Sequence, residues 1–287
     1  MLKLRQLSDI SELQMVCEKY EQIMLKLNWD MLKNRTPGST EDFFHYDQDR
    51  LVAYLAVYQF GPNIEVCGMT HPDYRRQGLF TKLWQQAADS GVFSGAHRVL
   101  LNVPRASTSG QSWIHTLRTS LNSVEYTMKL DEQGSLLDPV MHEIASLRLF
   151  REEDAPLWAR LDADAFDIPE SSTMNALSSP HGPLSKIMHV IEHQGLAAGK
   201  IEVSREDKQS WIYGFAIDPA LRGHGLGRSA LRQIAAEEKR LGQEVWLNVV
   251  ADNNRALHLY ESCGFVHQDI QDYYEYQGIP LRSAAQV

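Results

Sequence analysis

The sequence predicts an α/β protein built from two similar domains in tandem, each a mixed, mostly antiparallel sheet flanked by helices. A strand, a glycine-rich loop and an amphipathic helix follow one another at residues 211–241, and a similar order recurs 147 residues earlier. The 287 residues suffice for two domains. The polar stretch 131–139 suits a linker, which places the domains at 1–138 and 139–287.

The glycine-rich loop at residues 222–227 is the most informative segment. It follows the strand-like run 211–217 and reads Arg-Gly-His-Gly-Leu-Gly. Glycines let a backbone approach an anion closely, and the first turn of the next helix supplies unpaired N–H groups and a partial positive charge. The segment therefore predicts a cradle for the phosphates of a nucleotide cofactor.

Three loop patterns compete for this segment. The nucleotide-triphosphatase loop needs Gly where Arg222 stands and Lys where Arg228 stands. The dinucleotide fingerprint needs its third glycine one place beyond Gly227, and it normally follows the first strand of a domain. The pattern Gln/Arg-x-x-Gly-x-Gly/Ala is met in full by Arg222, Gly225 and Gly227. In this the segment resembles the acyl-CoA loop of the GNAT superfamily of N-acetyltransferases.

The residues after the loop extend the resemblance. Apolar residues share one face of a helix at 229–241, and residues 245–250 read as a buried strand. This strand contains Asn248 and is followed by Asn254 and by a short helix that carries Tyr260. That order is similar to the second half of the GNAT cofactor site.

The resemblance implies which residues hold acetyl-CoA, the co-substrate. A strand that splays from its neighbour would offer N–H groups to the pantetheine arm and the thioester oxygen, and the loop would offer amides to the pyrophosphate. Arginine side chains would add positive charge, and Asn254 would bind the arm or hold the loop. The expected cofactor-binding residues are Phe215, Ala216, Ile217, Arg222, Gly223, His224, Gly225, Leu226, Gly227, Arg228 and Asn254.

Tyr260 and Glu202 are the expected catalytic residues. The resemblance implies direct attack of an amine on the thioester, and a phenol with a pKa of about 10 can protonate a departing thiolate whose thiol has a pKa of about 8.5. Many relatives carry the basic Glu where Trp211 stands, so Glu202 is the nearest carboxylate, with His189 and His193 as alternatives. The non-catalytic interpretation of Tyr260 is an aromatic residue packed on the helix, and that of Glu202 is a solvated strand residue.

The N-terminal copy repeats this organisation with different residues at the site. Residues 71–80 align with 218–227, and the strand after the loop aligns with one residue less. The counterparts of Gly227, Asn254 and Tyr260 are, in order, Phe80, Thr108 and Leu117. A bulky aromatic at a position of close approach obstructs a pyrophosphate. We therefore expect a degenerate copy that no longer binds the cofactor well but can wall the acceptor pocket or stabilise the other domain.

The predicted function is an acetyl-CoA-dependent N-acetyltransferase that acts on a primary amine of a small molecule or peptide. A non-catalytic acyl-CoA-binding or regulatory module is the alternative that Trp211 keeps open, and a dinucleotide-binding oxidoreductase is a third. The fold does not supply the acceptor. The oligomeric state is also open, with a homodimer as one alternative.

Composition bears on the other classes. A net charge of −9 without clustered Lys and Arg argues against a nucleic-acid binder. No run approaches the roughly 18 to 20 apolar residues of a membrane span, and no signal peptide is apparent, so the expected location is cytoplasmic with no membrane partner. Cys17, Cys67 and Cys263 form no pattern with metal spacing, so we expect reduced thiols and no metal.

Two further segments carry weaker expectations. Residues 273–276, Tyr-Tyr-Glu-Tyr, favour the last strand of the sheet, which borders the acceptor site in relatives. Residues 171–183 are rich in Ser, Pro and Gly, which favours a loop over that site.

Overall fold

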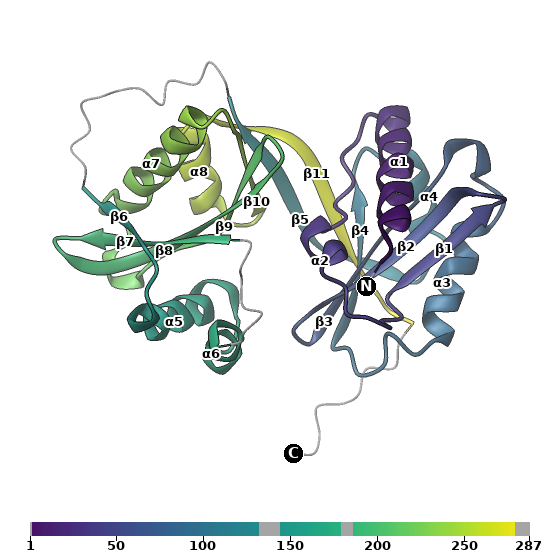
Figure 1. Cartoon of the computed structure of the whole chain (residues 1–287), viewed down its shortest axis with the longest axis horizontal. Helices are drawn as coiled ribbons and strands as arrows, with labels where there is room; N and C mark the ends of the chain where they lie inside the picture. Colours follow the sequence, from purple (N-terminus) through teal and green to yellow (C-terminus); the bar gives the residue numbers. More distant parts are fainter. Residues whose placement is uncertain (1, 132–143, 179–185, 279–287) are drawn as a thin grey trace. The chain divides into compact units, whose positions relative to one another are not determined.

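The computed structural model of this chain describes residues 2–131, 144–178 and 186–278. It contains two compact units (Figure 1). The N-terminal unit is Met1–Glu125 together with Asp269–Val287, and the C-terminal unit is Tyr126–Gln268. In each unit helices flank a mixed, mostly antiparallel sheet, which confirms the predicted fold class.

The N-terminal unit begins with helices and then builds its sheet. Its elements are α1 (Leu4–Glu21), α2 (Trp29–Lys33), β1 (Asp42–Asp47), β2 (Arg50–Phe60), β3 (Asn63–Thr70), α3 (Leu79–Asp89), β4 (Arg98–Pro104) and α4 (Thr108–Ile114). Ile10, Leu13 and Cys17 recur at helical spacing and bury one side of α1 against β2 and β3. Helices α3 and α4 pack on the opposite face of the same strands.

The C-terminal unit has the same plan. Its elements are β6 (Ser146–Leu149), α5 (Ala155–Phe166), α6 (Glu170–Ser178), β7 (Lys186–His193), β8 (Leu196–Glu206), β9 (Gln209–Ile217), α7 (Leu226–Arg240), β10 (Glu244–Val250) and α8 (Asn254–Ser262). Helices α5 and α6 lie on one face of the sheet, and α7 and α8 lie on the other (Figure 1). Residues 171–178 are therefore helical rather than the predicted loop, and 179–183 lie outside the described residues.

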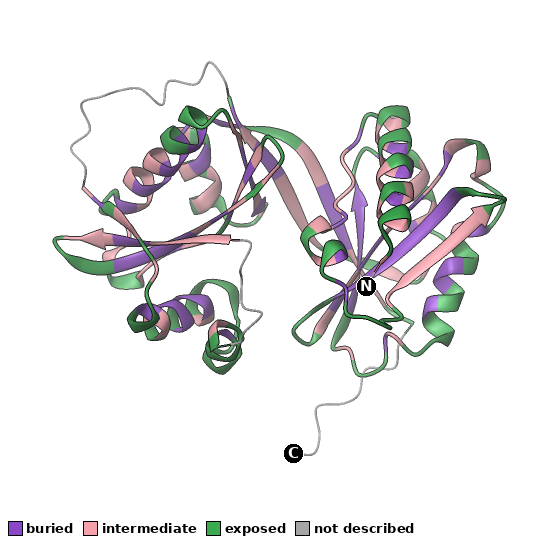
Figure 2. Cartoon of the chain, in the orientation of Figure 1, coloured by how far each residue is buried: buried purple, intermediate pink, exposed green. Residues whose placement is uncertain are grey.

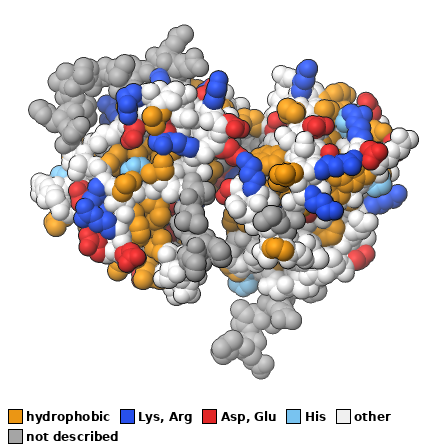
Figure 3. Space-filling view, in the orientation of Figure 1, with side chains coloured by type: hydrophobic (Ala, Val, Ile, Leu, Met, Phe, Trp, Pro, Cys, Tyr) orange, Lys and Arg blue, Asp and Glu red, His pale blue; other side chains and the backbone are white. Residues whose placement is uncertain are grey.

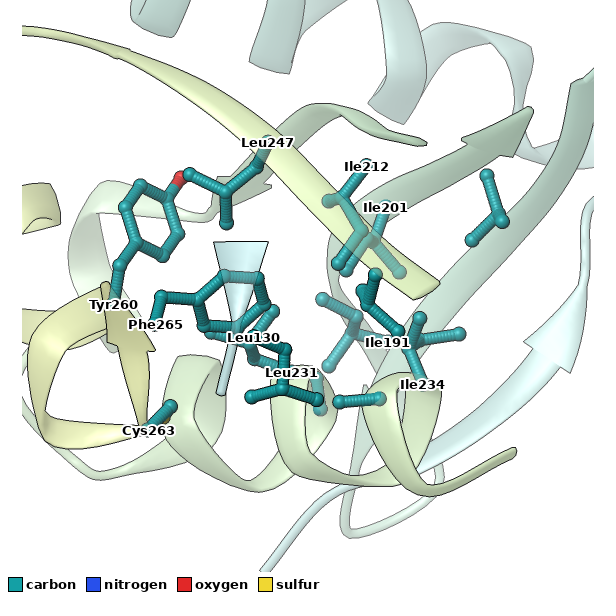
Figure 4. Close-up of a cluster of buried hydrophobic side chains, with 14 of the residues drawn as sticks. Leu130, Ile191, Ile201, Ile212, Leu231, Ile234, Leu247, Tyr260, Cys263 and Phe265 are labelled. Carbon is teal, nitrogen blue, oxygen red and sulfur yellow. The ribbon is translucent and has the colours of Figure 1, made fainter. Parts of the chain in front are cut away.

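The core of the C-terminal unit lies between its sheet and α7. Ala230, Leu231, Ile234 and Ala235 are fully buried on one side of this helix, as the apolar pattern predicts. Leu231 and Ile234 belong to one buried cluster with strand residues such as Ile191, Leu247 and Phe265 and with Tyr260 of α8 (Figure 4). Figure 2 shows the buried residues on the strands and on the inward sides of the helices.

Two strands have their ends in different units. These strands are β5 (Thr119–Leu130) and β11 (Phe265–Tyr276). Residues 119–125 and 269–276 belong to the N-terminal unit, where the Gln277 amide donates to the Arg118 carbonyl oxygen at 2.8 Å. At the other ends, in the C-terminal unit, the Asp131 amide donates to the Gly264 carbonyl oxygen at 2.9 Å. The strand order is β1-β2-β3-β4-β11-β5 in the N-terminal unit and β11-β5-β10-β9-β8-β7-β6 in the C-terminal unit, because β5 and β11 contribute residues to both.

The tyrosines of β11 therefore lie in the sheet of the N-terminal unit and not in that of the C-terminal domain, where the sequence placed them. Residues 273–276 do form a strand, but Tyr273 pairs with Asn102 of β4, and both belong to the N-terminal unit. The sequence placed this strand in the C-terminal domain because chain order alone assigned it there. The predicted boundary between residues 138 and 139 falls among residues 132–143, outside the described residues.

None of the helices in residues 2–131, 144–178 and 186–278 combines the length and apolar character of a membrane span. Basic and acidic side chains alternate in small groups on the face drawn in Figure 3. The three cysteines are buried and free, and burial raises the pKa of Cys17 to about 11.

Asp272 should be a main attachment of β11 to the N-terminal unit. Its carboxylate accepts hydrogen bonds from the Arg105 guanidinium, the shorter at 2.6 Å, and from the Gln111 amide at 3.1 Å, and its side chain is 5% exposed. Asp272→Ala should lower the free energy of unfolding by about 1–3 kcal/mol, because buried charge-assisted bonds are lost. Urea denaturation measures this.

The matched control for Asp272→Ala is Asp49→Ala, which breaks the exposed Arg5–Asp49 pair. This variant should leave the midpoint of unfolding unchanged, because surface ion pairs contribute little. Equal midpoints for both variants would show that Asp272 does not hold β11.

Candidate functional site

The glycine-rich loop is a turn that leads directly into α7. A short 3₁₀ helix, Pro219–Leu221, precedes it, and Asp218 caps that turn through the Ala220 amide at 3.0 Å. Gly223 and Gly225 have φ of +85° and +81°, which favours glycine. Leu226 and Gly227 form the first turn of α7, so the helix begins three residues before the predicted start at Ser229.

Arg222 anchors the loop. Its Nε donates to the Ile217 carbonyl oxygen at 2.9 Å, and its Nη2 pairs with Asp164 of α5. The guanidinium is thus already engaged at the end of β9. His224 is exposed, and its Nδ1 lies 3.1 Å from the Arg222 carbonyl oxygen. Both side chains interact with the turn itself. The groups that remain to bind a ligand are the backbone amides at the start of α7.

Strand β9 carries a bulge immediately before the loop. Lys200 of β8 pairs with Ala216 and Glu202 pairs with Tyr213, so two residues of β9 stand opposite one residue of β8. One of them, Gly214, has φ of +51°. A bulge of this kind bends and twists the strand. It turns Phe215 and Ile217 toward the core at α7.

Beyond the bulge, β9 and β10 separate. Their parallel register runs from Gln209–Glu244 to Ile212–Leu247 and is not found past that pair. Residues 213–217 of β9 therefore have no strand partner on the β10 side within the described part of the chain. Unpaired backbone N–H and C=O groups need partners, and a bound extended molecule can supply them. The separation includes the expected Phe215, Ala216 and Ile217.

Three elements converge beside this separation. A Cβ built on Gly227 would lie 3.4 Å from Phe215 Cζ of β9 and 3.4 Å from Leu259 Cδ2 of α8. The Phe215 and Tyr260 ring centroids are 6.4 Å apart. The structure thus brings together the loop end, the unpaired part of β9 and the α8 tyrosine, which the sequence placed in one site.

Tyr260 lies at the wall of this region. Its side chain joins the core, and its hydroxyl points toward Leu247 (Figure 4). We find no hydrogen bond from this hydroxyl to another described residue. Burial raises the pKa of Tyr260 to about 12. The phenol therefore keeps its proton near neutral pH and has a proton to donate.

Three polar side chains near the loop and the separated strands hold buried atoms without partners. These atoms are Nε of Arg228, Nε of Arg232 and Oδ1 of Asn248. Neither arginine forms an ion pair with a carboxylate of the described residues. Arg228 lies in the first turn of α7 and Arg232 one turn later beside Cys263, and guanidinium groups suit an anionic ligand. The sequence analysis missed Arg232, although its spacing of four from Arg228 puts both on one side of the helix.

Glu202 lies on the opposite face of the sheet from Tyr260. Its carboxylate is 3.5 Å from Lys200 Nζ and 3.2 Å from Lys186 Nζ, and Lys200 packs against Trp158 of α5. A Cβ on Gly214 would lie only 2.6 Å from Glu202 Oε1, so the bulge glycine makes room for this carboxylate. Glu202 thus lies at the bulge, beside the start of the separation between β9 and β10.

The remaining expected residues lie elsewhere. His189 is a half-buried residue of β7 whose charged neighbours are Glu237, Glu238 and Arg205, and burial lowers its pKa. The Nδ1 of His193 lies 2.9 Å from the Ile144 carbonyl oxygen. Asn254 is the exposed first residue of α8, and it is Asn253 that caps the helix. His189 pairs with Ile201 of β8, the residue opposite the bulge, whereas His193 pairs with Leu196 at the far end of the same strand.

The N-terminal unit repeats the loop but exchanges one contact. Gly78 has φ of +77°, and Arg75 Nε donates to the Thr70 carbonyl oxygen at 3.0 Å, as Arg222 does to Ile217. Phe80 stands at the position of Gly227, and Gly68 stands at that of Phe215. A Cβ on Gly68 would clash with the Phe80 ring. The ring and the glycine have changed places between the two copies.

The β3–β4 pairing ends at Val66 and Leu101, the counterparts of Ile212 and Leu247, but two other features of the C-terminal site have no equivalent among the described residues of the N-terminal unit. Strands β2 and β3 pair without a register shift, so the β9 bulge has no counterpart there. Trp113 packs edge-on against Phe80, with centroids 4.6 Å apart. Counted from the N-cap of each helix, the counterpart of Tyr260 is Ile114. The sequence alignment had paired Tyr260 with Leu117 instead. Neither Ile114 nor Leu117 can donate a proton.

A bulged strand that separates from a parallel neighbour, followed by a glycine turn into a helix, defines a class of fold whose backbone amides are arranged as an extended anionic ligand would require. The family profile described as "Acetyltransferase (GNAT) family" matches residues 5–109 and 145–265, which is more than half of the chain. The chain belongs to this family, and both segments match it.

Known proteins of similar sequence and fold agree. The chain is 28% identical over 263 residues to a mycothiol acetyltransferase of Thermobispora bispora, covering 83% of this chain and 84% of that protein. A GCN5-related N-acetyltransferase from Sphaerobacter thermophilus has a TM-score of 0.75 at 19% identity, over 98% of this chain and 99% of that one. A tandem GNAT protein from the clavulanic acid biosynthesis pathway has a TM-score of 0.69 at 16% identity, over 96% and 94%.

The exchanged ring and glycine allow a packing test. Gly227→Phe alone adds a second ring beside Phe215 and should destabilise the protein by about 1–3 kcal/mol. Phe215→Gly alone removes a packed ring. The double variant copies the arrangement of Phe80 and Gly68, so its loss of stability should be smaller than the sum by roughly 0.5–3 kcal/mol. Calorimetry measures the three losses, and strict additivity would contradict the exchange.

Tyr260 should make the free energy of unfolding fall more steeply as the pH rises above about 10. Its pKa is about 12 in the folded protein and about 10 when unfolded. The stability from the neutral phenol is therefore complete below pH about 10 and is lost as pH rises toward 12. Between pH about 9 and 11.5 the wild type should lose up to about 2 kcal/mol more than Tyr260→Phe. Parallel losses in urea titrations would contradict the burial of this hydroxyl.

Proposed function

We propose that the C-terminal unit is an acetyl-CoA-dependent N-acetyltransferase that acetylates a primary amine of a small molecule or peptide. The observation that carries this proposal is the unpaired backbone of β9 after its bulge, which leads into the glycine turn of α7. Membership of the family supports acetyl transfer. The name of the Thermobispora relative, mycothiol acetyltransferase, is compatible with a small acceptor.

The cofactor residues we propose are those of the loop and the separated strand. The amides of Gly223, Gly225 and Gly227 would hold the pyrophosphate, with Arg228 and Arg232 as its cations. The backbone of residues 215–217 would bind the pantetheine arm and the thioester oxygen, and Asn248, whose Oδ1 lacks a partner, would bind a donor of the arm. Arg222, His224 and Leu226 would shape the turn, and Asn254 would meet the arm from α8.

The proposed chemistry is direct attack of a neutral amine on the thioester carbon. The nitrogen lone pair forms the C–N bond, and the carbonyl electron pair moves to the oxygen beside the β9 amides. Collapse breaks the C–S bond, Glu202 takes the nitrogen proton directly or through water, and Tyr260 gives a proton to the sulfur. Exchange with solvent then restores both residues. The acetyl group moves and no proton is created or lost.

We propose no second acetyl transfer site in the N-terminal unit. Its regular β3 lacks the bulge, Phe80 and Trp113 fill the region beside the loop, and a residue without a proton to give stands in place of Tyr260. The alternative for the whole chain is a non-catalytic acyl-CoA-binding module. Trp211 favours it, because this residue stacks on Trp246 where relatives carry the basic Glu.

Single substitutions separate enzyme from binding module. Tyr260→Phe should lower kcat by about 10²–10⁴-fold while acetyl-CoA still binds with wild-type affinity, because only the proton donor is removed. Glu202→Gln should lower kcat similarly. Thiol release with amine acceptors measures the rate, and calorimetry measures binding. Cofactor binding without acetylation of any amine by the wild type would favour the binding module.

A further inference from the structure

Glu202 lies between two lysines whose situations differ. Lys200 is fully buried, and its ammonium pairs with Asp162 and lies 4.7 Å from the centroid of the Trp158 ring. Lys186 is 28% exposed, and its ammonium lies 3.2 Å from Glu202 Oε2 and 4.7 Å from the centroid of the Tyr213 ring. Among the described carboxylates, Glu202 is the ion-pair partner of Lys186.

The charges around Glu202 balance only while it is ionised. Lys186 faces it from β7 and Lys200 from β8, Tyr213 and Gly214 of β9 bring no charge, and Asp162 of α5 pairs with Lys200. When Glu202 accepts a proton from the amine, its negative charge disappears. Lys200 then keeps Asp162. Lys186 loses its carboxylate, and a half-buried ammonium without a counter-charge is unfavourable.

We propose that the acceptor is a primary amine with an anionic group, a carboxylate or a phosphate, close to its nitrogen, and that Lys186 binds this group. The inference rests on the proposed function, because Glu202 must be the base. The anion replaces Glu202 as partner of Lys186 when Glu202 takes the proton. Lys186 is then a specificity-determining residue of the acceptor site.

The geometry limits how far the amine and the anion can be apart. Lys186 Nζ is 3.2 Å from the carboxylate that receives the proton, so one acceptor molecule must reach both with a short span. An anionic group one or two carbons from the amine meets this requirement. The Tyr213 ring, 39% exposed beside Lys186, offers an apolar surface to the rest of the acceptor.

The test compares matched acceptors in the wild type and in Lys186→Met. Alanine, phenylalanine and glutamate would each be assayed by thiol release as the free acid, the carboxamide and the decarboxylated amine, with ethanolamine phosphate against ethanolamine as the phosphate arm. Wild type should prefer the anionic member of at least one pair by about tenfold or more in kcat/KM. Lys186→Met should reduce that ratio toward one, and Lys186→Glu should invert it.

Lys208→Met is the control, because it removes the same charge at the exposed β8–β9 turn and should keep the wild-type ratio. The carboxylate and phosphate arms identify which anion is preferred. Equal or better rates with the neutral members, or an unchanged ratio in Lys186→Met, would overturn the inference but leave the acetyltransferase intact. Acetyl-CoA that binds without acetylation of any anionic amine would also overturn it. Failure to bind acetyl-CoA would instead refute the proposed function.

Discussion

The end of pairing between β9 and β10 is the constraint on which the site depends. Up to Ile212 and Leu247 the two strands form an ordinary parallel pair. Beyond it, the bulge at Gly214 turns β9, and residues 213–217 have no strand partner on the β10 side within the described part of the chain. The same bulge positions Glu202 on one face and Phe215 on the other. The start of α7 and the side chains of α8 lie against the Phe215 ring on the side of Tyr260.

The loop regions of the two copies share the turn but differ in the residues packed beside it. The turn is preserved in both, including the arginine that bonds back to the strand end. In the N-terminal copy the ring belongs to Phe80 of the helix and packs on Gly68 of the strand. In the C-terminal copy the ring belongs to Phe215 of the strand and packs beside Gly227 of the helix. Phe80 is therefore accommodated by Gly68, so a bulky residue in the loop is not the whole difference. The bulge and the α8 phenol distinguish the C-terminal copy as well.

Much of the fold and the site could be predicted because local patterns determine them. The apolar side of α7, the glycine turn and the order of strand, loop and helix follow from spacing and backbone preferences. The bulge left a trace: β3 and β9 align at an offset of 146 before it, and the loops align at 147 after it. The register leaves Gly214 and Phe215 opposite one residue of β8, and Gly214 is the extra residue because Gly68 faces Phe80 as Phe215 faces Gly227.

Other features depend on contacts between distant residues. Nothing local to residues 273–276 indicates that they pair with β4, because a strand pattern does not name its partner. Lys186 of β7 lies beside Glu202 of β8 only because the sheet pairs these strands, and only the fold shows that the buried Nε of Arg232 lacks a hydrogen-bond partner. Residues 171–178 form a helix because Thr173 donates to Asp162 and packs α6 on α5, which outweighs their loop-like composition.

The most direct test of the account is a calorimetric titration of acetyl-CoA that counts sites per chain. The account predicts one site in the wild type and none in Gly227→Phe, whose added ring fills the space between the helix start and β9. Two sites in the wild type, with one surviving in the variant, would contradict the assignment of the cofactor to the C-terminal unit alone. No binding to the wild type would contradict the acetyl-CoA site itself.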